Sequence, residues 1–380
     1  MRKLYAGPSY QGRETIQTVF CGGIDMRKIS VDGVREGMLL ARTIYSEDGN
    51  ILLSAGMKLM ESYISRLKGL NIYEIYIDDK ISYDIEINDI ISDETRFEAR
   101  VAIKNAMDSI RFGSSIDVKP IRDTVCRMID ELMNDKNAVI NLHDIKSLDQ
   151  YTFGHSVNVC VLSIITGLSM DYDQDKLKEL AMGAMLHDIG KTRIPAEILN
   201  KPDALTDSEF EIIKKHTNYG YEMLKKSVEL TTYASYIALT HHEKYNGEGY
   251  PLGLKGDGIH EFSRIVAIAD VYDAITSDRA YKRRRQISEA IEYLVGMGGH
   301  HFDYEIVRKF LGHVTTYPLG TCVKLNTGQT AIVVDINKKY PNRPIIRLIR
   351  DEAGVMLDRF SELDLTTNNT LLITDIVEEI

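Results

Sequence analysis

The spacing of hydrophobic residues changes twice along the chain and divides it into three regions. Residues 27–80 contain short apolar or alternating runs, such as Ile72-Tyr-Glu-Ile-Tyr-Ile77, and turns rich in Gly and Asp separate these runs. Alternation with a period of two is typical of strands. Over residues 58–70 the apolar positions instead recur at near-helical intervals. The first region therefore predicts a small α+β domain.

The second region runs from Asp93 to about Gly312 and has helical spacing, clearest over residues 94–112 and 121–133. Apolar residues at this interval over such a length predict a helical bundle. Residues 313–380 alternate again, with turns between the runs, which predicts a small β barrel or sheet. We therefore expect a multi-domain chain in which an all-α helical bundle is flanked by a small α+β domain and a small all-β domain.

These changes of pattern also set the expected boundaries. Residues 1–26 carry Gly, Pro, Ser and Gln without a period, so we predict a flexible leader. Met26 begins the regular pattern, and the sequence leaves open whether it is the true start. The units expected to follow are an α+β domain at 27–92, a helical connector at 93–137, the main helical domain at 138–312 and a β domain at 313–380.

Composition narrows the class of protein. Hydrophobic residues make up 44% and charged residues 27% of the 380 positions, which is ordinary for a globular protein. The net charge of −10 argues against a general binder of nucleic-acid polymers, because such a protein would have a basic surface. A small anionic substrate stays compatible with this charge if metal ions and a few local Lys or Arg residues lie beside it.

The cysteines and the apolar runs bear on the cellular compartment. The cysteines are scattered without a C-x-x-C pair, at Cys21, Cys126, Cys160 and Cys322. This pattern suggests free thiols in a reducing cytosol, so we expect a cytoplasmic protein. The most apolar stretch, residues 159–168, is too short for a membrane span of about 20 residues. The N-terminus also lacks the long apolar region of a secretory signal.

Histidines and aspartates are the most informative residues of the helical region. His187 and Asp188 are adjacent in Met185-Leu-His-Asp-Ile-Gly-Lys191. The other candidates lie on separate helical segments and are His155, His216, His241, His242 and Asp270. Neutral imidazoles and carboxylates bind divalent transition metals such as Fe, Mn or Zn. Five histidines and two aspartates are too many for one tetrahedral site and suit two ions that share a carboxylate.

Each of these residues also has a plainer explanation. A single helical His is more often a surface or core residue than a ligand, and Asp188 alone fits a helix cap. Asp270 is harder to explain, because it follows the apolar run Ile265-Val-Ala-Ile-Ala269 and a buried carboxylate is costly unless it is paired or metal-bound. The doublet His241-His242 before a Gly-rich loop is also uncommon. Together the residues predict a metal centre.

Four segments resemble the HD phosphohydrolase superfamily, and its HD-GYP branch in particular. The resemblance covers about residues 140–312. Its segments follow the family's order and are His187-Asp188 followed by Gly190-Lys191, His241-His-Glu-Lys-Tyr-Asn-Gly-Glu-Gly-Tyr-Pro251, Asp270-Val-Tyr-Asp-Ala-Ile-Thr-Ser-Asp-Arg-Ala-Tyr281 and Gly299-His-His-Phe-Asp303. The resemblance implies an enzyme that hydrolyses cyclic di-GMP, a bacterial second messenger, at a non-haem iron or manganese centre.

By position, the resemblance also implies the ligands of two metal ions. One ion would be held by His155, His187, Asp188 and Asp270, and the other by Asp188, His216, His241 and His242, with Asp188 shared. Some family members carry a Glu four residues before the first His and bind a third metal. That position is Tyr151 in this chain, so we expect two metals.

Further residues are expected to contact the substrate. Lys191, one helical turn after the His-Asp pair, would bind a phosphate oxygen or assist proton transfer. Arg279 and Lys282 are candidates for the second phosphate, because Arg suits bidentate contacts.

The loop at 246–251 has its own expected features. Gly247 and Gly249 allow backbone conformations that other residues avoid, and Pro251 fixes the exit. Tyr250 has two open roles: it packs against a base, or it only stiffens the turn.

The resemblance implies an active phosphodiesterase that converts cyclic di-GMP to pGpG, GMP or both. Two alternatives stay open, namely a hydrolase of another cyclic dinucleotide such as cyclic GMP-AMP, and a non-catalytic nucleotide-binding signalling module. The intact ligand set and Lys191 favour catalysis. Besides the cyclic dinucleotide, the expected partners are a second copy of the chain or a signalling protein, bound through the Gly-Tyr-Pro loop or the N-terminal domain.

Overall fold

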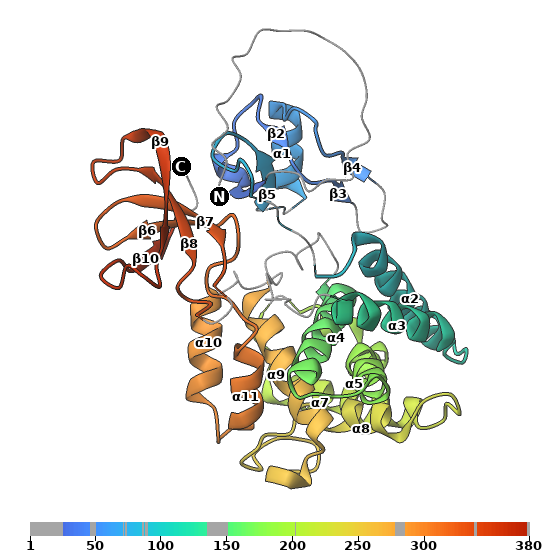
Figure 1. Cartoon of the computed structure of the whole chain (residues 1–380). Helices are drawn as coiled ribbons and strands as arrows, with labels where there is room; N and C mark the ends of the chain where they lie inside the picture. The colour runs from blue at the N-terminus through green and yellow to red at the C-terminus, as the bar shows by residue number, and fades with distance from the viewer. Residues whose placement is uncertain are drawn as a thin grey trace.

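The structure is a computed structural model that describes residues 26–45, 51–70, 72, 74–85, 87, 90–134, 151–201, 203–277, 286–337 and 340–377. Apart from Met26, the predicted leader lies outside the described residues. A helical body carries two small β-containing domains at one end (Figure 1). This arrangement confirms the expected order of an α+β region, a helical domain and a β domain.

The N-terminal domain is built on an antiparallel sheet with the strand order β1-β5-β2. Its elements are β1 (Arg27–Ser30), the 3-10 helix η1 (Val31–Gly33), β2 (Leu39–Leu40), β3 (Ile44–Tyr45), β4 (Ile51–Leu53), α1 (Glu61–Gly69) and β5 (Glu74–Asp78). Ile75 and Ile77 of β5 share one apolar core with Ile64 and Leu67 of α1. The apolar residues of strand β5 and helix α1 therefore pack into a single small core.

The central body consists of helices. They are α2 (Asp93–Arg111), α3 (Lys119–Asn134), α4 (Tyr151–Ser169), α5 (Gln174–Leu186), η3 (Ile189–Arg193), α6 (Ala196–Leu199), α7 (Asp207–Leu224), α8 (Thr232–Thr240), η4 (Gly256–Gly258), α9 (Glu261–Thr276), α10 (Ile287–Gly296) and α11 (Tyr304–Leu311). Helix α7 begins with a capping box, in which Thr206 and Glu209 satisfy each other's backbone N–H groups. The segment predicted as a connector forms α2 and α3, whose apolar faces share the core of the bundle.

The C-terminal domain is a five-stranded antiparallel sheet with the order β10-β6-β7-β8-β9. Its strands are β6 (Cys322–Leu325), β7 (Thr330–Asp335), β8 (Ile345–Arg350), β9 (Met356–Asp364) and β10 (Ile373–Ile376). Alternate residues such as Val323, Val333 and Ile346 are buried in a core of its own. The predicted all-β domain is therefore confirmed.

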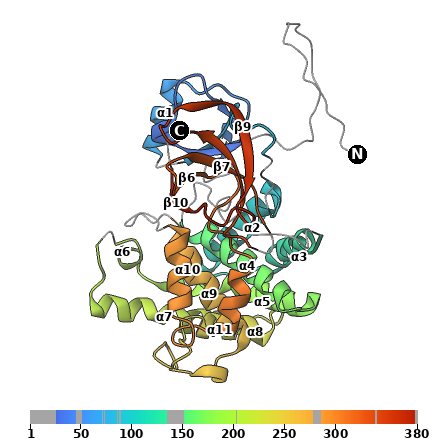
Figure 2. The same ribbon diagram turned by 60° about the vertical axis from the view of Figure 1, so that its left-hand side comes forward.

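The two terminal domains also pack against each other, which the sequence did not predict. Ile85 and Ile87 join Ile332 and Ile349 in one apolar cluster. Arg347 is buried and donates to the carbonyl of Tyr83 and to the carboxylates of Asp84 and Glu362. In Figure 2 both terminal domains lie above the helices, at the same end of the helical body. Together they form one unit outside the helical body.

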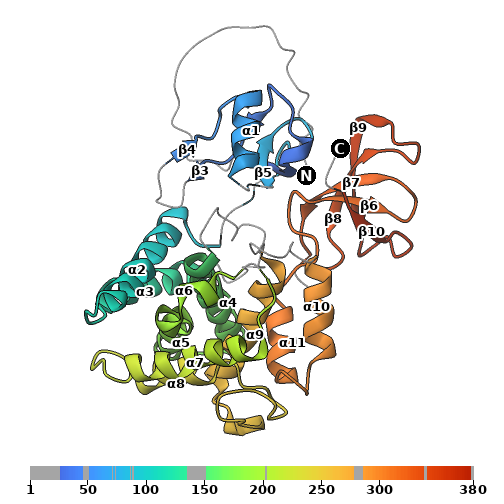
Figure 3. The same cartoon turned by 180° about the vertical axis from the view of Figure 1, so that it is seen from behind.

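Three further observations concern the whole chain. Within the described ranges, no helix is both long and apolar enough to cross a membrane. The described cysteines, Cys126, Cys160 and Cys322, are free thiols. In the body, α4 contacts α5 and α9, and α8 contacts α5, α7 and α9. Figure 3 shows these five helices grouped together in the helical body.

Candidate metal centre

The predicted ligands come from different helices and meet inside the bundle. His155 lies in α4, and His187 ends α5 with Asp188 directly after it. The remaining ligands are His216 in α7, His241 at the end of α8 with His242 directly after it, and Asp270 in α9. All of them are buried except His242, which is partly exposed. The structure therefore brings the candidate residues of five helical segments close together.

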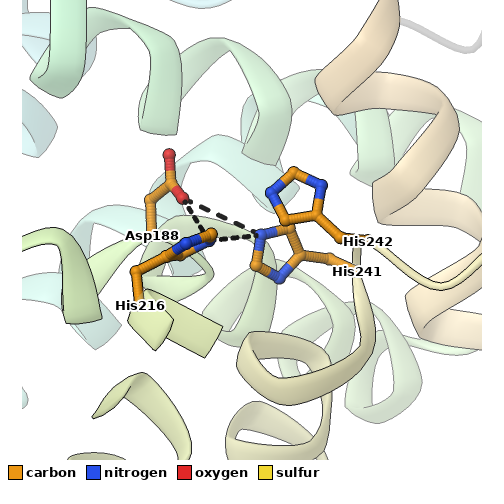
Figure 4. Close-up of side chains that lie close together, drawn as sticks. All are labelled: Asp188, His216, His241 and His242. Carbon is orange, nitrogen blue, oxygen red and sulfur yellow. Dashed lines mark hydrogen bonds and ion pairs between the residues drawn. The ribbon is translucent and has the colours of Figure 1, made fainter. Parts of the chain in front are cut away.

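One cluster contains Asp188, His216, His241 and His242 (Figure 4). A ligand atom from each residue lies within 4.8 Å of the others. Oδ1 of Asp188 is 3.4 Å from Nε2 of His216 and 3.8 Å from Nε2 of His241. Burial keeps these imidazoles neutral: it lowers the pKa of His216, it lowers the pKa of His241 far below its usual value, and it lowers the pKa of His242 to about 3.

The second cluster contains His155, His187 and Asp270. Nε2 of His155 is 3.0 Å from Oδ1 of Asp270. The other oxygen of Asp188, Oδ2, lies 3.4 Å from Nε2 of His187 and 3.8 Å from Nε2 of His155. Each carboxylate oxygen of Asp188 thus faces a different cluster, as a shared ligand requires.

The ring nitrogens that face the clusters fit cation ligands. Nδ1 of His216 lies 2.7 Å from the carbonyl of Ile213, and Nδ1 of His241 lies 3.0 Å from the carbonyl of Ile237. A carbonyl only accepts hydrogen bonds, so each Nδ1 carries the proton and each Nε2 presents a lone pair. These two Nε2 atoms are 3.3 Å apart. Facing lone pairs repel each other unless a cation binds them.

Two buried polar atoms support the same conclusion. Nε2 of His187 and Oδ1 of Asp188 make no hydrogen bond to any described residue. The Nδ1 atom of His187 lies 2.6 Å from the carbonyl of Ala184, which fixes the same tautomer as in His216 and His241. Buried polar atoms are normally satisfied, and divalent ions supply what imidazole and carboxylate ligands need. The donor set of the two clusters therefore fits a binuclear metal site.

Lys191 sets the charge state of the shared carboxylate. Its ammonium group forms an ion pair with Oδ2 of Asp188. Burial alone would raise the pKa of Asp188, but the ammonium group of Lys191 holds this pKa well below its usual range. Asp188 is therefore ionised. The predicted position of Lys191 beside the His-Asp pair is observed in the structure.

The sequence analysis missed Asp273, which orients His155. Nδ1 of His155 donates to Oδ2 of Asp273 at 2.7 Å, and Asn158 donates to Oδ1 at 2.8 Å. Although burial lowers it, hydrogen bonds to Asp270 and Asp273 raise the pKa of His155 to about 9. Asp273 lies three residues after Asp270, on the same face of α9, and this spacing was the available signal.

The Gly-Tyr-Pro loop lies against the first cluster. The ring of Tyr250 packs on that of His242, with centroids 4.8 Å apart and planes at 31°. Gly247 has φ +88°, and a Cβ on Gly249 would lie 2.2 Å from the backbone nitrogen of Lys244. Gly247 therefore has the backbone conformation that was predicted, whereas Gly249 is required for a different reason, because a side chain would collide with the backbone of Lys244.

A second residue that the sequence analysis missed anchors this loop. Glu243 is buried directly after the His doublet. Its carboxylate accepts from the backbone N–H groups of Leu252 at 2.7 Å and Leu254 at 3.0 Å. Because Glu243 follows His242, the loop and the histidine ligands are held as one unit. The predicted substrate contacts Arg279 and Lys282 lie outside the described residues.

Comparison with protein families identifies two domains. Residues 128–306 match the HD domain model, and residues 322–380 match a KOW domain associated with the HD domain. Among solved structures, the chain is similar to Bd1817, an HDG"Y"P protein from Bdellovibrio bacteriovorus, at 19% identity and a TM-score of 0.51. The match covers 75% of this chain and 98% of that one, and it supports the fold alone.

Curated relatives are more similar in sequence. Cyclic di-GMP phosphodiesterase PA4108 of Pseudomonas aeruginosa is 36% identical over 237 residues, which are 62% of this chain and 57% of the relative. Cyclic di-GMP phosphodiesterase of Thermotoga maritima is 40% identical over 164 residues, or 43% of this chain and 45% of the relative. The 3'3'-cGAMP-specific phosphodiesterase 2 of Vibrio cholerae is 38% identical over 192 residues, or 49% and 36%.

The chain spans less than two thirds of the length of these curated relatives. The HD domain match contains all the clustered histidines and aspartates, and the Gly249-Tyr250-Pro251 segment follows the His doublet inside it. This chain therefore contains an HD domain of the HD-GYP type, followed by the KOW domain that is associated with it.

Proposed function

We propose that this protein is a metal-dependent phosphodiesterase that hydrolyses cyclic di-GMP to pGpG, GMP or both. The observation that carries the proposal is the pair of buried His/Asp clusters on either side of Asp188. Relatives named as cyclic di-GMP phosphodiesterases share 35–40% identity with this chain over 154 to 237 residues. Iron or manganese is the proposed metal, because both accept imidazole and carboxylate ligands.

The proposed ligands are the seven residues of the two clusters. His155, His187 and Asp270 would hold one ion, and His216, His241 and His242 the other, with Asp188 between them. Two such ions, when bound, supply an activated water and neutralise charge on the phosphoryl oxygens. The residues of the chain hold this arrangement in place, since backbone carbonyls and Asp273 fix the histidine rings.

Lys191 is the proposed catalytic partner of Asp188. Its ammonium group is partly exposed, so it reaches both the shared carboxylate and the space where a phosphate would approach. In this position it would bind a phosphate oxygen or assist proton transfer to the leaving group. Arg279 and Lys282 remain proposed contacts of the second phosphate on the sequence resemblance alone.

A mixed cyclic dinucleotide is the second candidate substrate. Two relatives from Vibrio cholerae are named 3'3'-cGAMP-specific phosphodiesterases and share 38% and 34% identity with this chain. The same two-metal chemistry serves both substrates, because they differ only in one base. A partner protein bound through the Gly-Tyr-Pro loop or the N-terminal domain, homodimerisation and a cytoplasmic location are further parts of the proposal.

One experiment separates these functions. Protein loaded with Fe(II) or Mn(II) is incubated with cyclic di-GMP, 3'3'-cGAMP and cyclic di-AMP, and the products are resolved by chromatography. Linear pGpG or GMP as the dominant product supports the proposed function. Faster turnover of 3'3'-cGAMP supports the second candidate. Binding without any hydrolysis would instead support a non-catalytic signalling module.

A further inference from the structure

Beside the metal centre, α7 and the Gly-Tyr-Pro loop bring two aromatic rings and a cation together. The ring centroids of Phe210 and Tyr250 are 6.3 Å apart, with the planes nearly perpendicular at 81°. Nζ of Lys214 lies 5.0 Å from the centroid of Phe210 and 5.5 Å from that of Tyr250. Neither Phe210 nor Lys214 has a role in the hydrolysis proposed above.

This group of residues adjoins the clustered ligands. Lys214 precedes His216 by two residues on α7, and the ring of Tyr250 packs on His242 with centroids 4.8 Å apart. The contacts therefore lead from His242 through Tyr250 to Phe210. In a cyclic dinucleotide each base is one sugar away from a phosphate. A base would thus lie near these rings when a neighbouring phosphate lies at the metal centre.

The group is also open to a ligand. Phe210 is 44% exposed, so part of its ring surface is free for stacking. Lys214 forms an ion pair with Glu211 at 2.6 Å, and Glu211 is itself 65% exposed. A solvent-exposed pair of this kind is weak. Since an ammonium group has three N–H donors, Lys214 can bind a second acceptor without losing Glu211.

We propose that Phe210, Lys214 and Tyr250 form a purine subsite that selects guanine over adenine. The inference rests on the proposed function and deepens it. Phe210 stacks on the base, which favours either purine. Lys214 donates to O6 and N7 of guanine, which are both acceptors, whereas adenine presents an amino donor in place of O6. The charge of Lys214 therefore distinguishes the two bases.

The same helix provides a matched control. Lys225 pairs with Glu222, three residues before it, and its Nζ lies 4.9 Å from the ring centroid of Tyr221. This arrangement repeats the lysine, glutamate and aromatic ring of the purine subsite. It does not include Tyr250, which connects Lys214 to His242. If Lys214 were only a surface cation on an aromatic ring, Lys214→Met and Lys225→Met would have equal effects.

The test measures substrate preference and metal content together. The full chain is prepared as wild type, Lys214→Met, Lys225→Met and Phe210→Leu, each loaded with Mn(II). Each protein gives kcat and KM for cyclic di-GMP and an inhibition constant for cyclic di-AMP as competitor. We expect Lys214→Met to raise KM for cyclic di-GMP about tenfold, with kcat and the cyclic di-AMP constant nearly unchanged.

The other two variants test the stacking contact of Phe210 and the control position Lys225. Phe210→Leu should weaken both dinucleotides about tenfold, since stacking is the same for either purine. Lys225→Met should match wild type, and all four proteins should hold equal manganese. The subsite is overturned if Lys214→Met keeps the wild-type preference, or if its manganese content falls. A wild-type protein that hydrolyses no cyclic dinucleotide would overturn the proposed function itself, which is a distinguishable result.

Discussion

Oδ2 of Asp273 lies 2.7 Å from Nδ1 of His155, and this contact orients the ring whose Nε2 faces Asp270 and Asp188. Asp273→Asn removes the charged acceptor while keeping its size. We expect metal affinity to fall about 10- to 100-fold, because partners that orient a histidine ligand contribute this much. Metal titration of the purified variant measures the effect.

The control for this prediction is Ser277→Ala. Ser277 donates to Oδ1 of Asp273 at 3.2 Å, and not to the oxygen that accepts from His155. This variant should bind metal nearly as wild type does. Equal metal affinity for Asp273→Asn and wild type, with an unchanged melting temperature in both, would show that Asp273 has no positioning role.

Asp188→Ala tests the shared ligand. Oδ1 faces one cluster and Oδ2 faces the other, so the loss of this carboxylate weakens both metal sites at once. We expect metal loading and turnover to be abolished while the protein still folds. Elemental analysis gives metal per chain, and far-UV circular dichroism checks the fold. Two metal ions per chain in the variant would contradict the assignment.

Removal of the metal should stop hydrolysis reversibly. The Nε2 lone pairs of His216 and His241 face each other, and a bound cation removes the repulsion between them. We expect the site to be inactive without such a cation. A chelator should therefore abolish turnover, and Fe(II) or Mn(II) should restore it. Product release measured before and after re-addition tests this. Full activity in protein shown by elemental analysis to be metal-free would refute the two-metal proposal.

Most candidate ligands have a local signal in the sequence, namely His187-Asp188, His241-His242 and Asp270 in its apolar run. His155 and His216 were candidates as histidines on separate helical segments, and the resemblance supplied the division of the ligands between two ions. The division into two clusters around Asp188 agrees with the structure. Fold classes were also predictable, since the changes between periods of two and 3.6 coincide with the domains.

The supporting residues were not predictable in the same way. The spacing from Asp270 gave Asp273 a signal, but its contact with His155 depends on how α4 and α9 pack. The contact of Glu243 likewise depends on how the Gly-Tyr-Pro loop folds back. The packing of the two terminal domains was missed for a similar reason. Its contacts join Asp84 to Arg347, 263 positions apart, and no periodicity connects them.

Glu243→Gln tests the anchor of the Gly-Tyr-Pro loop. The carboxylate accepts from Leu252 and Leu254 with separate oxygens, whereas an amide has only one acceptor oxygen. One backbone N–H then loses its partner, at a cost of about 1–3 kcal/mol. We expect faster amide hydrogen exchange over residues 244–254 and a higher KM.

Glu248→Gln is the control, because Glu248 is exposed and bonds only to Asn246 among the described residues. Equal exchange in both variants would show that Glu243 does not hold the loop.

Arg347→Leu tests the packing of the two terminal domains against each other. Arg347 is buried, and its partners Asp84 and Glu362 are 59% and 51% exposed. Water can solvate these carboxylates once the arginine is gone, so we expect a loss of about 1–3 kcal/mol, typical of hydrogen bonds to charged groups. Thermal unfolding should show an earlier transition for the terminal unit, while metal content stays at the wild-type level because the clusters lie in the helical body. Arg359→Leu on β9 serves as the control, since its side chain is exposed. A fall in metal content for Arg347→Leu alone would instead mean that the terminal unit supports the metal centre.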